Sequence, residues 1–125
     1  MDFKLELIPV PVADVDRAKQ FYVEQAGFHL DHDVRPGGPV RVVQLAPPGA
    51  ACSIVLAAGL PGLAMPAGAL RGLHLVVADI TEARAELAGR GVVMDEIQDL
   101  GGMKYAGFRD PDGNTWTLQE IPPRA

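Results

Sequence analysis

The sequence is poor in three features, and each deficit excludes a class of protein. One of the 125 residues is a cysteine, so there is no internal disulfide framework and no zinc cluster built from cysteines. The 11 basic residues are scattered and outnumbered by 16 acidic ones, whereas a nucleic-acid-binding protein needs a basic patch. No apolar run approaches the roughly 20 residues that span a bilayer. We therefore expect no nucleic-acid partner and no membrane partner.

The chain has the composition of a folded globular protein. Apolar residues make up 48% and charged residues 22%, and 125 residues fit one domain. The start of the chain, residues 1–4, alternates apolar and charged side chains and lacks the apolar region of a signal peptide. We expect a single domain, residues 1–125, located in the cytoplasm.

The first half of the chain predicts a strand, a helix and three more strands. Residues 4–10 alternate charged and apolar side chains, as a half-buried strand does. Pro9 and Pro11 favour an edge or module-boundary strand. Asp14 is the predicted N-cap of a helix that ends near Gly27. Three strands separated by turns rich in proline and glycine are then predicted at residues 28–34, 40–46 and 52–57.

The second half repeats the first after an uncharged connector, residues 59–70, that is rich in glycine, proline and alanine. The motif VAD followed by a β-branched residue occurs at residues 12–15 and again 65 residues later at 77–80. A helix and a glycine follow both copies. Strands are then predicted at residues 92–97, 103–109 and 115–120, with a turn at residues 110–114 (DPDGN). This agreement favours an internal duplication.

Two motifs carry a resemblance to a known family. The helix DVDRAKQFY (residues 14–22) and the hairpin DPDGNTWTLQE (residues 110–120) resemble the vicinal oxygen chelate superfamily, which contains glyoxalases, bleomycin-resistance proteins and dioxygenases. The resemblance implies an α+β fold of two tandem βαβββ modules that form curved mixed sheets around a cavity. Module 1 would span roughly residues 3–58 and module 2 roughly residues 69–121. Many relatives are dimers, so we expect a homodimer.

The resemblance also indicates where a metal would bind. Metalloenzymes of this superfamily place one ligand, usually His or Glu, on each of four strands. Here the corresponding positions hold Leu7, Val55, Gly72 and Thr117. Divalent metals need several imidazole or carboxylate groups that converge, so we expect no metal and no cofactor.

Several other side chains are candidates for binding a small molecule. His74 lies two residues after Gly72, on the strand face that the resemblance assigns to the cavity. Polar residues alternate along the last strand and would face the same cavity, unless they form a solvated surface. The candidate ligand-binding residues are His74, Met103, Tyr105, Thr115, Thr117 and Gln119. A regular strand would place His29 and His32 on opposite faces, which excludes their joint binding of one ion.

Three functions are consistent with these residues. The leading hypothesis is a metal-independent small-molecule-binding protein of the bleomycin-resistance type, which would sequester an antibiotic or other metabolite. The first alternative is a lyase or isomerase that uses His74 in the pocket. The second is an enzyme whose metal is held by unusual ligands that include His74. The sequence leaves open the ligand, the presence of catalysis, and whether modules pair within a chain or between subunits.

Overall fold

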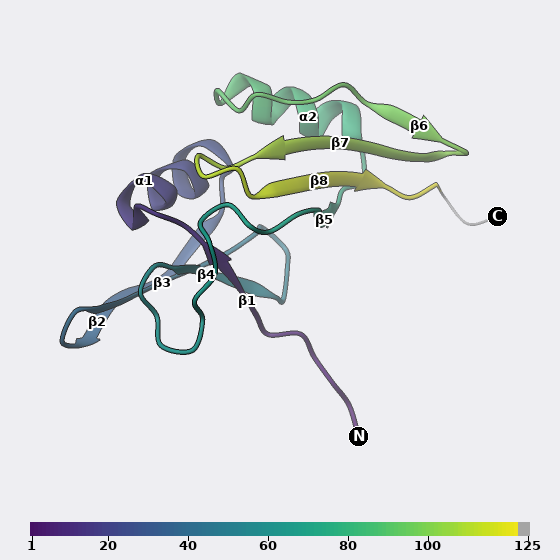
Figure 1. The fold of residues 1–125 in the computed structure, drawn as a ribbon. Coiled ribbons are helices and arrows are strands. Elements are labelled where there is room, and N and C mark those ends of the chain that lie inside the picture. Colours follow the sequence, from purple (N-terminus) through teal and green to yellow (C-terminus); the bar gives the residue numbers. More distant parts are fainter. Residues whose placement is uncertain (123–125) are drawn as a thin grey trace.

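The computed structural model describes residues 1–122 and shows the same order of elements twice (Figure 1). The first module contains β1 (Leu7–Pro11), α1 (Val15–Gln20), the π-helical turn η1 (Phe21–Gln25), β2 (His29–Gly37), β3 (Val40–Ala46) and β4 (Ser53–Ala57). The second contains β5 (Leu73–Val76), α2 (Ile80–Gly89), β6 (Gln98–Leu100), β7 (Met103–Arg109) and β8 (Thr115–Glu120). No helix within residues 1–122 is long and apolar enough to cross a membrane.

The strands form two four-stranded mixed sheets with equivalent topology. Sheet 1 has the order β1-β4-β3-β2 and sheet 2 has the order β5-β8-β7-β6. The first and last strands of each module pair in parallel, and in both modules the helix carries the chain from the first strand across the sheet to the strand at the opposite edge. The other strand pairs are antiparallel. The predicted α+β class with two tandem βαβββ modules is confirmed.

Both helices begin in the same way, which explains the repeated VAD motif. The side chains of Asp14 and Asp79 accept hydrogen bonds from the backbone N–H groups of Arg17 and Glu82, at 3.1 and 3.0 Å. Each aspartate thus satisfies one of the N–H groups that a helix start leaves without a partner. The predicted N-cap at Asp14 is confirmed.

The two modules share one hydrophobic core, which lies between the helices and the sheets. Tyr22 and Phe28 of the first module lie 5.8 and 5.4 Å, centroid to centroid, from Trp116 of the second. The rings of Phe108 and Trp116, both in the second module, are stacked with centroids 6.2 Å apart. Because the contacts of Tyr22 and Phe28 with Trp116 cross the module boundary, neither module buries its apolar surface alone.

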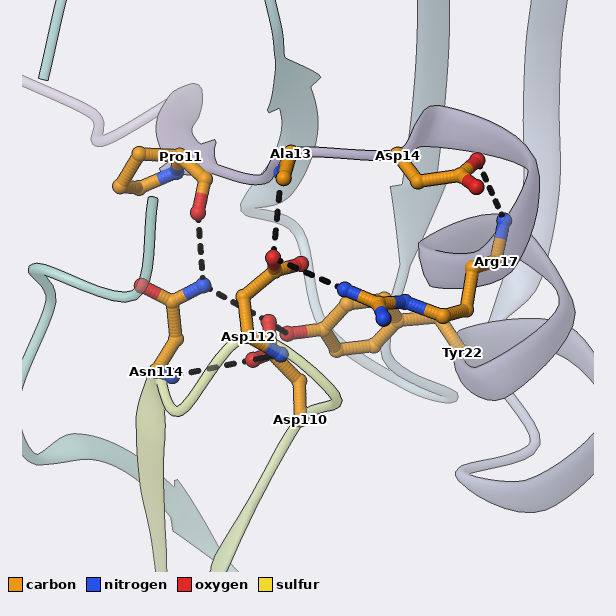
Figure 2. A network of polar contacts seen from close by, with 8 residues as sticks. All are labelled: Pro11, Ala13, Asp14, Arg17, Tyr22, Asp110, Asp112 and Asn114. Atoms are coloured by element: carbon orange, nitrogen blue, oxygen red, sulfur yellow. Dashed lines mark hydrogen bonds and ion pairs between the residues drawn. The ribbon is translucent and has the colours of Figure 1, made fainter. Parts of the chain in front are cut away.

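A buried polar network joins the modules beside this core (Figure 2). The Tyr22 hydroxyl donates to Asp110 Oδ2 at 2.7 Å and accepts from Trp116 Nε1 at 2.9 Å. Asn114 Nδ2 donates to the same carboxylate oxygen at 2.8 Å and to the carbonyl oxygen of Pro11 at 2.9 Å. Burial, and then the charge of Asp110, raise the pKa of Tyr22, so its hydroxyl stays protonated and keeps its donor role.

The turn at residues 110–114 is closed by one aspartate and connected to the first module by another. Asp110 Oδ1 accepts from the backbone N–H groups of Asp112 and Asn114, which closes the predicted turn at residues 110–114. Asp112 Oδ1 accepts from Ala13 N and from Arg17 Nη2, both at 3.1 Å, and thereby ties the turn to the start of α1.

Three predicted strands differ from those observed by three residues or more, and one of them is β2, predicted at residues 28–34 and observed at His29–Gly37. Residues 92–97 are not a strand, and the third element of the second sheet is β6, at Gln98–Leu100. Arg84 of α2 donates to the carbonyl oxygens of Asp95 (2.8 Å) and Met94 (3.4 Å), so this side chain occupies acceptors that a strand ladder would use. The first strand was predicted to begin at residue 4 but begins at Leu7, because its partner β4 begins opposite Leu7, at Ser53.

Candidate functional site

The two faces of sheet 2 have different surroundings. Trp116 and Leu118 of β8 are 3% and 2% exposed and lie in the core. Residues that alternate with them point to the opposite face, where the side chains are half-buried or exposed. We call this surface the open face and define it by His74, Val76, Met103, Tyr105, Thr115, Thr117 and Gln119.

Strand register places the predicted ligand-binding residues next to one another. His74 lies opposite Thr117 in the β5–β8 pair, and Tyr105 lies opposite Gln119 in the β7–β8 pair. The rings of His74 and Tyr105 meet edge to face, with centroids 6.2 Å apart. Met103 precedes Tyr105 by two residues and Thr115 precedes Thr117 by two, so all six residues share one face. That they bind a ligand stays a prediction.

The polar groups on the open face are not equally free. Thr115 Oγ1 accepts from the backbone N–H of Gly72 at 2.7 Å, so this hydroxyl has a structural role. His74 Nδ1 contacts the Gly72 carbonyl oxygen, which can only accept, so Nδ1 carries the proton and Nε2 remains free. Within residues 1–122 the side chains of Thr117 and Gln119 make no hydrogen bond with protein groups. Their polar atoms, with His74 Nε2 and the Tyr105 hydroxyl, are available to a ligand.

The four positions that the family uses for metal ligands do not fit a metal ion here. Val55 lies opposite Pro9 in the β1–β4 pair, as Thr117 lies opposite His74 in the β5–β8 pair, so the two modules present equivalent positions. Valine, like the leucine and glycine at the other two positions, carries no donor atom on its side chain. In the described part of the chain no three His, Cys, Asp or Glu residues are grouped so that they could hold a metal.

The expectation that His29 and His32 point to opposite faces is wrong. Their partners on β3 are Ala46 and Gln44, which are two residues apart and therefore on one face. An irregularity between Leu30 and His32 inserts one residue into β2 and shifts the alternation, as a β-bulge does. His29 instead lies 3.7 Å from the carboxylate of Asp31.

A cavity of about 470 Å³ lies between the modules, beside β5, which is an edge strand of sheet 2. Of the six candidate residues only His74 lines it. The other walls come from α2 (Glu86, Leu87 and Arg90), from β7 (Phe108), and from residues 26–28 and 47–50 of the first module. Sequence reasoning did not find this cavity, because its walls belong to both modules. The only signal was the apolar character of the 47–50 turn.

The sheet topology is that of glyoxalase-like proteins. The family model of the Glyoxalase/Bleomycin resistance protein/Dioxygenase superfamily matches residues 4–118. The chain belongs to this superfamily.

Individual relatives extend this comparison. The chain is similar to TnmS3, an antibiotic binding protein from Streptomyces sp. CB03234, with 42% identity, a TM-score of 0.84, and coverage of 96% of this chain and 97% of that one. A glyoxalase/bleomycin resistance protein from the same strain is 43% identical, with a TM-score of 0.78 and coverage of 92% and 98%. The uncharacterized protein YetH of Bacillus subtilis (strain 168) is 26% identical in an alignment 121 residues long that covers 90% of this chain and 94% of YetH.

Proposed function

We propose that this protein is a metal-independent, homodimeric small-molecule-binding protein that sequesters an antibiotic or similar metabolite on the open face of sheet 2. The observation that carries the proposal is the pair Thr117 and Gln119. Both are half-buried, both lack a hydrogen-bond partner within residues 1–122, and both lie beside the rings of His74 and Tyr105. A few placed polar groups among apolar and aromatic walls are typical of ligand sites.

The relatives support a binding role. TnmS3 is an antibiotic binding protein, and this chain shares 42% of its residues and nearly all of its length with it. Binding also suits the polar groups available, since neither threonine nor glutamine titrates near neutral pH. Sequestration requires only hydrogen bonds and contact area, which the open face offers.

The exposed apolar surface supports the homodimer. Val76 on the open face and Leu100, opposite Met103 on β6, are 64% and 62% exposed, and Ile121, just beyond β8, is 48% exposed. These side chains are spread across the width of sheet 2, from β5 to β6, and covering exposed apolar surface with a second copy is favourable. A second copy that covers them would also close the open face over a ligand.

A lyase or isomerase is the alternative, and one observation favours it. The contact between His74 Nδ1 and the Gly72 carbonyl leaves the lone pair of Nε2 free to accept a proton from a substrate. Within residues 1–122, however, His74 forms no ion pair with a carboxylate that would stabilise its charged form. Binding without turnover is therefore the better-supported function.

A thermal-shift screen of antibiotics and aromatic or glycosylated metabolites tests the proposal. A ligand at 100 times its Kd stabilises the folded protein by about 2.7 kcal/mol, or roughly 10 °C in Tm for a domain of this size. We expect at least one such compound to be recovered unchanged after incubation with the protein. Conversion of the compound by wild type but not by His74→Ala would replace this proposal with the enzyme alternative.

A further inference from the structure

The cavity between the modules lies on the helix side of sheet 2. Leu118, one of its walls, is 2% exposed and points into the core, away from the open face. Leu75 lies opposite Leu118 in the β5–β8 pair, and Ala83 and Leu87 of α2 supply a further wall. His74 borders the cavity from β5, the edge strand. A molecule in this space would therefore contact the core side of the sheet, whereas the open face lies on its other side.

Most walls of the cavity are apolar, as those of a small-molecule site are. The first module contributes Phe28 and Pro47, and the second contributes Leu87 and Phe108. The volume of about 470 Å³ lies within the range of roughly 300–1,000 Å³ that such sites have. An occupant therefore needs a mainly apolar body with few polar groups. Within residues 1–122, the polar side chains that line the cavity are those of His74, Glu86 and Arg90.

Arg90 brings a positive charge to this cavity and uses few of its hydrogen-bond donors. Its Nη1 lies 3.5 Å from the carbonyl oxygen of Glu24, and its Nη2 lies 3.9 Å from the carboxylate of Glu86. A charge-assisted hydrogen bond is shorter, at about 2.7–2.9 Å, so both contacts are weak. Because a guanidinium carries several N–H donors in a planar fork, those of Arg90 can serve a bound anion.

Both modules set the position of this guanidinium. The backbone N–H of Arg90 donates to the carbonyl oxygen of Leu87 at 3.0 Å, at the end of α2. Gly27 of the first module leaves room for the side chain, because a Cβ at this residue would lie 3.0 Å from Arg90 Nη1. The fork of donors therefore stands at the cavity before any ligand binds. Such a fork fits a carboxylate, with which it forms two parallel hydrogen bonds.

Glu86 limits the charge of an occupant. Its side chain is 69% exposed and remains solvated, so it leaves the charge of Arg90 largely uncompensated. A second carboxylate on the ligand would be repelled by Glu86, and no other cationic side chain lines the cavity within residues 1–122. A ligand with one carboxylate is therefore favoured.

We propose that the cavity between the modules binds a small monocarboxylate with an aromatic or aliphatic body. The carboxylate pairs with Arg90, and the body packs against Leu75, Leu87 and Phe108. This second site lies on the other side of sheet 2 from the open face and does not depend on the ligand bound there.

Calorimetric titration with three probes of similar shape tests the charge of the ligand. The probes are phenylbutyrate, phenylbutyramide and phenylbutylamine, which share the phenylalkyl body and end in an anion, a neutral amide and a cation. We expect phenylbutyrate to bind with a Kd below about 1 mM. It should bind about tenfold more tightly than the amide, because hydrogen bonds between charged groups are the stronger ones, and the amine should bind most weakly. Equal Kd values for the three probes, or no binding of phenylbutyrate, would overturn the proposal.

Arg90→Gln tests the residue that recognises the carboxylate. Glutamine keeps a polar side chain and removes the charge, so the Kd of phenylbutyrate should rise about tenfold and that of the amide less than about threefold. The matched control is Arg35→Gln, which removes the same charge at an exposed position of β2 near the β2–β3 turn. The control should leave both Kd values unchanged. If Arg90→Gln binds phenylbutyrate as wild type does, the assignment of the carboxylate to Arg90 is wrong.

Amide chemical-shift changes on addition of phenylbutyrate locate the site in the wild-type protein. We expect the largest changes at residues 26–28, 47–50 and 83–90, the segments that line the cavity. Met103 and Gln119 on the open face should change little. Largest changes at these two residues would show that the probe binds the open face, and the cavity site would be refuted.

Substitutions distinguish the failure of this site from the failure of the proposed function. Thr117→Val should weaken a ligand of the open face and leave the Kd of phenylbutyrate unchanged, and Arg90→Gln should do the reverse. Binding of phenylbutyrate in the cavity of a protein that sequesters no antibiotic would contradict the function proposed above and support the cavity site. Loss of phenylbutyrate binding in Thr117→Val would overturn the cavity site and leave the open face as the ligand site.

Discussion

The substitution Tyr22→Phe tests whether the buried polar network holds the two modules together. Tyr22 is 0% exposed, and its ring packs against Phe28 and Trp116. Phenylalanine keeps the ring and these contacts and removes only the hydroxyl. The change therefore creates no large cavity, and its cost reports on the hydrogen bonds.

The magnitude follows from the two bonds that disappear. Trp116 Nε1 donates to the Tyr22 hydroxyl, and within residues 1–122 it has no other acceptor, so a buried donor is left without a partner. Asp110 Oδ2 keeps its bond from Asn114 but loses the donor at 2.7 Å. An unsatisfied buried donor costs about 1–3 kcal/mol, and a hydrogen bond to a charged group contributes about 1.5–3 kcal/mol. Because the two losses share one hydroxyl, we expect the free energy of unfolding to fall by about 2–4 kcal/mol.

Urea unfolding followed by tryptophan fluorescence and circular dichroism measures this loss. Both probes should show one shared transition, because the modules have a common core, and its midpoint should fall by about 1–3 M in urea. The matched control is Tyr105→Phe, since the Tyr105 hydroxyl forms no hydrogen bond within residues 1–122; it should stay within about 0.5 kcal/mol of wild type. If Tyr22→Phe were equally neutral, the network would not stabilise the fold and the reasoning would be refuted.

Three further predictions concern charge, backbone and metal. Hydrogen bonds from Arg41 and, with a smaller effect, Lys19 hold the pKa of Asp33 below its ordinary value, so the stabilisation is present above about pH 4 and lost as pH falls. In urea unfolding, Arg41→Gln should lower the free energy of unfolding by about 1 kcal/mol at pH 7 and by less at pH 2. Gly68→Ala should lower Tm far more than Gly62→Ala, because both glycines have positive φ but only at Gly68 would a Cβ clash with a backbone oxygen, that of Asp112. Elemental analysis of purified protein should find no stoichiometric transition metal or zinc; one metal per chain that is lost in His74→Ala would revive the metal-enzyme alternative.

Local signals made most of the fold predictable. Asp14 and the 110–114 turn act through hydrogen bonds to backbone groups a few residues away, so the local sequence was sufficient to find them. β3, β7 and β8 occupy the predicted residues because alternation along a strand is also a local pattern. The equal strand orders of the two sheets follow from the repeat, since similar segments fold alike.

Contacts between distant residues account for what sequence reasoning missed. The segment at residues 92–97, expected as a strand, instead binds the guanidinium of Arg84 through the carbonyl oxygens of Met94 and Asp95. The bond between Tyr22 and Asp110 joins residues 88 positions apart, so the turn motif gave no indication of its partner. The bulge in β2 placed His29 and His32 on one face instead of on opposite faces. No pattern in the sequence indicated the bulge.

Part of the candidate site was predictable, because alternation along a strand is a local pattern. Alternation along β8 and β7 was enough to place Thr117, Gln119 and Tyr105 on one face. Tertiary contacts decide whether each polar side chain already has a hydrogen-bond partner. The Thr115 hydroxyl accepts a hydrogen bond from Gly72 N, whereas the Thr117 side chain forms none within residues 1–122. The cavity beside β5 combines segments from both modules, and the apolar 47–50 turn was its one signal in the sequence.

The most direct test of ligand binding on the open face is calorimetric titration of a screened compound into wild type, Thr117→Val and Thr81→Val. Valine keeps the shape of threonine and removes its hydroxyl, and Thr81 offers the same change on the exposed surface of α2. A lost hydrogen bond of about 0.5–1.5 kcal/mol corresponds to a Kd roughly three- to tenfold weaker. We predict this loss for Thr117→Val, an unchanged Kd for Thr81→Val, and an unchanged Tm for both unliganded variants. Equal affinity in all three proteins would contradict the assignment of the ligand to the open face.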